Sequence, residues 1–141
     1  MSNFAAEWEI TQLMYEYNRA TDHQDFDRLA ACFTDTGVFV GAYATWTMRP
    51  QVREFAEFVR GRTKVGQVRH YISHPLIEID GDTADAVTAL LMTRLDEAGQ
   101  PQVVLTGEYH DSLVRTDGRW LFELRTVVVD RTSSTADSSH G

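Results

Sequence analysis

The sequence of 141 residues is short of three things: cysteine, positive charge and long apolar runs. Its single cysteine, Cys32, cannot form an intrachain disulfide, so a disulfide-stapled secreted scaffold is excluded. Thirteen Lys and Arg against 21 Asp and Glu give a formal net charge of -8, and the basic residues are scattered. Nucleic acids and anionic membranes are therefore not expected partners, because both require clustered positive charge. No apolar stretch approaches the length of a membrane span.

Signals for cofactors, metals and export are also missing. The glycine-containing stretches "GDTADA" and "GRTKVG" fit neither a P-loop nor a dinucleotide fingerprint, so no nucleotide or flavin cofactor is expected. His70 and His74 would lie about 13 Å apart along a strand, too far to bind one ion, so no metal is expected. The opening "MSNFAAEWEI" has acids and no basic start, which predicts no signal peptide and a cytoplasmic location.

Apolar periodicity predicts helices first and strands afterwards. Spacings of three and four residues predict helices in three segments, residues 5–22, 25–33 and 50–61, whereas residues 37–47 look extended. From Val68 onward four strand-like runs are separated by the turn signals "DGD", "DEAGQP" and "TDG". We therefore predict one α+β domain over residues 1–132, followed by a flexible polar tail at residues 133–141. Three N-terminal helices packed on a curved antiparallel sheet, mixed at its edge, would enclose a conical pocket.

Three stretches together resemble a known family. They are "YNRATDHQDFDRLAACFTDTGVF", "RHYISHPLIEIDGDTA" and "EYHDSLVRTDGRWLFELRTV". Their order and spacing resemble the SnoaL-like branch of the nuclear-transport-factor-2-like (NTF2-like) superfamily, from about Phe4 to Thr132. The resemblance implies a cone-shaped fold and a homodimer, or a trimer. The superfamily contains dehydratases, dehydrohalogenases, isomerases, polyketide cyclases, epoxide hydrolases and non-catalytic binding proteins, so the fold alone does not settle the function.

One subgroup is similar at the chemical positions. Scytalone dehydratase, bile-acid dehydratase and hexachlorocyclohexane dehydrochlorinase use a His–Asp pair, and the matching positions here are His70 and Asp22. The resemblance also adds Tyr17 and Arg125. His70 would then be the general base, and Asp22 would orient it. Tyr17 would donate a hydrogen bond, and Arg125 would either stabilise negative charge or pair with Asp22.

Two departures separate the chain from other branches of the superfamily. The ketosteroid isomerases place a basic Asp where this sequence reads "VFVGAYA", which has no carboxylate. The epoxide hydrolases use an Asp–Arg–Asp set, and the second Asp has no convincing counterpart. Both departures favour the dehydratase-like subgroup.

Further histidines and apolar residues are candidates for binding the substrate. His74 shares a face with His70 if the strand is regular, although Pro75 favours a bulge there, so a structural role remains the alternative. Tyr109 and His110 face opposite ways; Tyr109 is favoured for the pocket, and His110 is a secondary candidate. The apolar candidates for the pocket wall, any of which can be ordinary core instead, are Met14, Val38, Val40, Trp46, Phe55, Phe58, Val59, Leu90 and Met92.

These observations predict a cofactor-independent lyase. It would carry out a dehydratase-type elimination on a small hydrophobic hydroxylated or carbonyl compound. An isomerase or a polyketide cyclase of the same fold is the alternative, because the same base can start each reaction by removing an acidic C–H proton. A non-catalytic domain for small-ligand binding or dimerisation is the alternative from a different class of function.

Overall fold

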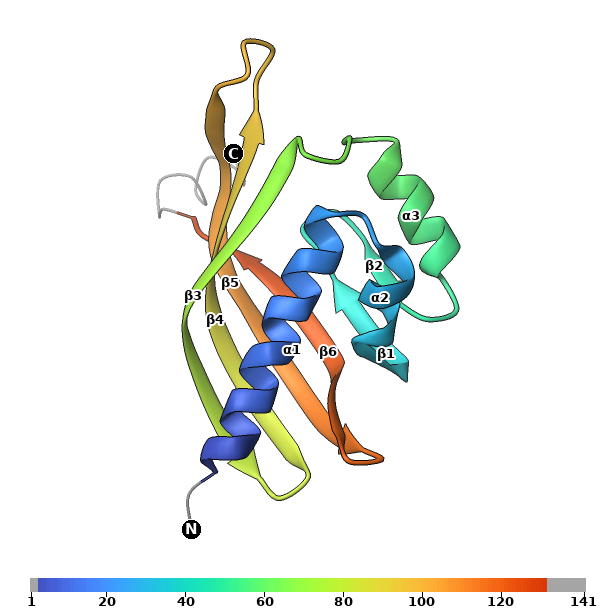
Figure 1. Cartoon of the computed structure of the whole chain (residues 1–141), viewed down its shortest axis with the longest axis vertical. Coiled ribbons are helices and arrows are strands. Elements are labelled where there is room, and N and C mark those ends of the chain that lie inside the picture. Colours follow the sequence, from blue (N-terminus) through green and yellow to red (C-terminus); the bar gives the residue numbers. More distant parts are fainter. Residues whose placement is uncertain (1–2, 132–141) are drawn as a thin grey trace, which may run out of the picture.

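The computed structural model describes residues 3–131, in which three helices and two shorter strands precede four long strands (Figure 1). The elements, in chain order, are α1 (Phe4–Asp22), α2 (Phe26–Ala31), β1 (Phe33–Val40), β2 (Thr45–Thr47), α3 (Val52–Arg60), β3 (Val68–Asp80), β4 (Thr83–Leu95), β5 (Pro101–Thr116) and β6 (Arg119–Val129). The polar tail predicted at residues 133–141 lies outside the described residues. Within residues 3–131, no helix is long and apolar enough to cross a membrane.

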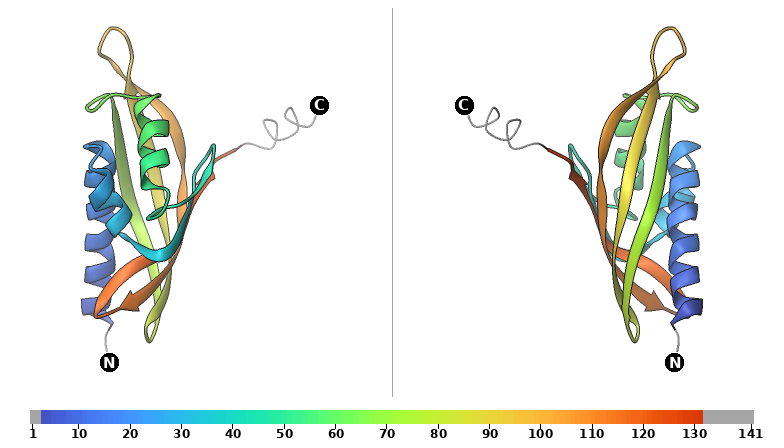
Figure 2. Two further views of the ribbon diagram at one scale, coloured as in Figure 1. Left: turned by 90° about the vertical axis from the view of Figure 1, so that its right-hand side faces the viewer. Right: turned by 90° about the vertical axis from the view of Figure 1, so that its left-hand side faces the viewer.

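A single six-stranded sheet carries the fold. Its strand order is β2-β1-β6-β5-β4-β3, and every neighbouring pair is antiparallel except β1 and β6, which run parallel. The sheet is strongly curved, and all three helices lie on its concave side (Figure 2). The predicted α+β cone with a mixed edge is therefore confirmed.

The helices form where apolar residues repeat with helical spacing. In α1, Ile10, Leu13, Met14 and Tyr17 are buried and face the sheet. The short helix α2 is capped by Asp25, whose side chain accepts a hydrogen bond from the Arg28 backbone N–H at 3.4 Å. Because α1 packs beside β3, its last turn brings Thr21 to the cavity and Asp22 to β3.

The extended segment predicted at residues 37–47 differs from the observed one. Strand β1 begins at Phe33, which was predicted to be the last residue of a helix, and so it starts four residues before the predicted extended segment. The cause is non-local: Phe33 pairs with Phe122 of β6, and an irregularity follows before Val38 pairs with Leu124. Residues 41–44 then turn the chain into β2.

Strand β3 is not regular either. Its register with β4 shifts between Ser73 and Leu76, and His74 has a φ of 56°. This bulge, directly before Pro75, breaks the alternation that would place His74 on the same face as His70.

Candidate functional site

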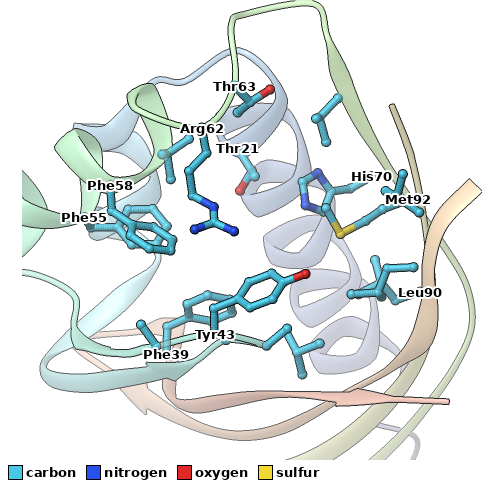
Figure 3. Close-up of a pocket in the computed structure, with 18 of the residues that line it drawn as sticks. Thr21, Phe39, Tyr43, Phe55, Phe58, Arg62, Thr63, His70, Leu90 and Met92 are labelled. Carbon is cyan, nitrogen blue, oxygen red and sulfur yellow. The ribbon is translucent and has the colours of Figure 1, made fainter. Parts of the chain in front are cut away.

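A largely apolar cavity of about 370 Å³ lies between α3, the β1–β2 segment and the concave face of β3, β4 and β5 (Figure 3). Its walls contain six of the predicted pocket residues: Trp46, Phe55, Phe58, Val59, Leu90 and Met92. Aromatic rings also pack against one another there, as Trp46 does against Phe55 at 5.7 Å between ring centroids. The cavity therefore suits an apolar or aromatic body.

His70 and Asp22 form a close pair at the edge of this cavity. His70 Nδ1 lies 2.8 Å from Asp22 Oδ1, and the His70 backbone N–H donates to the same oxygen at 3.0 Å. The side chains of His70 and Asp22 are 12% and 14% exposed. Asp22 is the last residue of α1, and His70 is the third residue of β3, so the pair links a helix end to the sheet. A carboxylate accepts hydrogen bonds, so this contact favours the imidazole tautomer that has its proton on Nδ1 and its lone pair on Nε2.

Two buried tyrosines, Tyr17 and Tyr109, also line the cavity. Their rings meet edge to face at 5.8 Å. Burial raises the pKa of Tyr109 to about 12, and burial together with Tyr109 raises the pKa of Tyr17 well above its ordinary value. A phenol is neutral near pH 7 even at its ordinary pKa, so both side chains can donate a hydrogen bond to a ligand in the cavity.

Thr21 was not singled out from the sequence. It lines the cavity, and its hydroxyl is buried without a hydrogen-bond partner among residues 3–131. Because buried polar groups are usually satisfied, this hydroxyl is available to a ligand. The only sequence signal is its place next to Asp22.

Arg125 lies behind the cavity rather than in its wall. It is completely buried, and its guanidinium carbon lies 3.6 Å from the Tyr109 ring centroid and 4.3 Å from that of Tyr17. Its ion-pair partner is Asp111, with 3.0 Å between Nε and Oδ1, and not Asp22. The buried cation thus stacks on both tyrosines from outside the cavity.

Burial also perturbs Asp111, which sequence reasoning did not single out. Loss of water raises the pKa of its carboxyl group to about 6, although the nearby Arg125 guanidinium lowers it.

Five other predicted residues lie outside the cavity lining, and two of them are Val38 and Val40 on β1. Met14 is buried in the core outside the cavity lining, and its sulfur accepts from the Thr88 hydroxyl at 3.6 Å. His74 is exposed and contacts Ser73 Oγ through Nδ1 at 2.8 Å. His110 is exposed and faces away from the cavity, and its Nε2 lies 3.0 Å from Glu108 Oε1. Over residues 3–131, no three His, Cys, Asp or Glu side chains converge as metal ligands.

Comparison with solved structures identifies relatives over nearly the whole chain. A variant of Rv3472 from Mycobacterium tuberculosis, a protein of unknown function, is 30% identical with a TM-score of 0.83, over 95% of this chain and 79% of that one. A candidate scytalone dehydratase from Novosphingobium aromaticivorans is 23% identical with a TM-score of 0.78, over 92% and 87% of the two chains. ActVI-ORFA from Streptomyces coelicolor is 22% identical with a TM-score of 0.76, over 91% and 99%. The curated proteins contain no match.

The family assignment follows from the sequence as well as from the fold. Residues 2–126 match the model of the SnoaL-like domain, which is most of the chain. The solved structures similar to it include proteins with the cystatin-like and NTF2-like fold. The chain therefore belongs to the SnoaL-like domain family.

Proposed function

We propose that the protein is a cofactor-independent lyase that removes water from a small, largely apolar β-hydroxy ketone. The observation that carries this proposal is the 2.8 Å contact between His70 Nδ1 and Asp22 Oδ1 beside an apolar cavity. The carboxylate fixes the tautomer in which Nε2 is unprotonated, and imidazole is the side chain best suited to accept a proton near neutral pH. The likeness in fold to a candidate scytalone dehydratase supports the same reaction class.

The reaction needs no redox partner. His70 Nε2 takes a proton from the carbon next to the carbonyl group, and the C–H electron pair forms an enolate. The enolate electrons then form the C=C bond as the β-hydroxyl group leaves, and the imidazolium returns the proton to it. One water molecule is released, and His70 is again neutral. Asp22 stabilises the imidazolium between the two steps.

The neutral polar groups of the cavity supply the remaining hydrogen bonds. Tyr17 and Tyr109, whose phenols are neutral near pH 7, donate to the enolate oxygen from the cavity wall. The buried Arg125 cation behind their rings stabilises the negative charge that develops on the enolate oxygen. The unpartnered hydroxyl of Thr21 contacts the leaving hydroxyl group.

Product analysis on a panel of bicyclic β-hydroxy ketones tests the proposal. We expect the purified protein to convert at least one compound to the unsaturated ketone or its aromatic tautomer, detected by mass spectrometry as loss of one water. An isomer of unchanged mass would instead favour an isomerase or cyclase. Binding without any conversion would leave a ligand-binding protein and contradict the proposal.

A further inference from the structure

The charged side chains in the cavity wall are all positive. Arg62 and Arg94 line the cavity, and none of the described lining residues is Asp or Glu. This contrasts with the whole chain, in which 21 acidic residues outnumber 13 basic ones. Apolar walls concentrate the field of such charges, so the cavity attracts anions although the protein as a whole is negative.

Arg62 is held in place by aromatic rings rather than by a carboxylate. Its guanidinium carbon lies 4.8 Å from the ring centroid of Tyr43 and 4.9 Å from that of Phe58. In Figure 3 the guanidinium group points into the cavity between these rings. Among residues 3–131, no Asp or Glu forms an ion pair with it, whereas Arg28, Arg49 and Arg115 each have an acidic partner.

The second arginine reinforces the position of the first. Arg94 on β4 donates from Nη2 to the backbone carbonyl oxygen of Arg62 at 2.9 Å. This hydrogen bond ties the chain after α3 to the sheet and places the Arg94 guanidinium beside the backbone of Arg62. Tyr43, which is 77% exposed, marks this side of the cavity as its mouth.

We propose that Arg62 is the carboxylate-binding residue of the cavity mouth, so that the substrate has an apolar ring body and a carboxylate at the end remote from the reacting carbon. When aromatic rings contact the faces of a guanidinium group, the N–H donors at its edge stay free. These donors match the two oxygens of a carboxylate. The assignment rests on the proposed function only in placing the opposite end of the substrate at His70.

The test compares 2-naphthoate with 2-naphthamide by isothermal titration calorimetry. The two probes share a fused-ring body and differ in charge. We expect the wild type to bind naphthoate about tenfold more tightly, which corresponds to about 1.4 kcal/mol for a charge-assisted contact at an open mouth. Arg62→Gln should bind the two probes equally, with its affinity for naphthamide unchanged. Arg53→Gln, which removes the same charge from an exposed position on α3, should keep the preference.

Equal binding of the two probes by the wild type, no binding of either, or a preference that survives in Arg62→Gln would overturn the assignment. Neither probe has a leaving hydroxyl group, so these outcomes are independent of the lyase proposal. The preference should also persist in His70→Gln, in which the proposed chemistry is removed. Failure of the lyase proposal would appear instead as absent water loss from the β-hydroxy ketones.

Discussion

His70→Gln should lower kcat/KM for dehydration of the β-hydroxy ketone about a thousandfold, because a positioned general base contributes on this scale. Glutamine is similar in size and keeps a polar group between Asp22 and the cavity, but its amide cannot take a proton from carbon. Asp22 can still accept from the backbone N–H of residue 70, which holds the end of α1 against β3. Initial rates measured on the wild type and the variant give the ratio.

His74→Gln is the matched control. It makes the same chemical change four residues along β3, where the structure places the side chain in solvent outside the cavity. We expect its rate to equal that of the wild type. A His70→Gln enzyme with wild-type turnover and an intact circular dichroism spectrum would contradict the role of His70 as base.

Asp22→Asn tests the other half of the pair. An amide can donate to Nδ1, which favours the wrong tautomer and puts a proton on Nε2, so kcat should fall by about 10²–10⁴. Asp27→Asn is the matched control, because it removes the same charge from the exposed side of α2. Nitrogen NMR of labelled histidine reports the tautomer of His70 directly. Unchanged tautomer and rate in Asp22→Asn would show that the carboxylate only braces the backbone.

The sequence predicted the elements that depend on local pattern. The helices follow from apolar spacings of three and four residues. The hairpins β3–β4, β4–β5 and β5–β6 follow from the turn signals between the strands. The parallel pairing of β1 with β6 joins segments that no turn connects, and the early start of β1 at Phe33 depends on that pairing. The pairing of Asp22 with His70, 48 residues apart, came from the family resemblance and not from periodicity.

Two bulges limited prediction of the site. Counting back from the turn between β5 and β6 places Arg125 opposite His110, but the register shifts between Ser112 and Leu113, so Asp111 pairs with it instead. The other bulge turns His74 out of the cavity. Because one extra residue reverses the facing of every side chain beyond it, alternation predicts facing only up to the first bulge.

Arg125→Met should reduce the free energy of unfolding by about 3–5 kcal/mol at pH 8, because removing one member of a buried ion pair leaves the other charge uncompensated. Methionine replaces the aliphatic stem of Arg125 against Tyr17 and Tyr109, so the lost charge accounts for most of the change. Urea unfolding followed by tryptophan fluorescence gives the free energy. The double variant Arg125→Met/Asp111→Leu, with both charges removed, should recover most of the loss.

The free energy of unfolding lost in Arg125→Met should be smaller at pH 5 than at pH 8. The direction of this change follows from the pKa of Asp111. Its pKa of about 6 is above that of an unfolded aspartate, so the native state holds the proton more tightly. Its contribution to stability is therefore complete below about pH 4 and is lost as the pH rises through 6. Arg125 lowers this pKa, so its removal makes the buried charge of Asp111 more destabilising at pH 8. At pH 5 the Asp111 carboxyl group is largely protonated in both the wild type and Arg125→Met. A loss of equal size at pH 5 and pH 8 would mean that Arg125 stabilises the fold by packing on the rings and not by its charge.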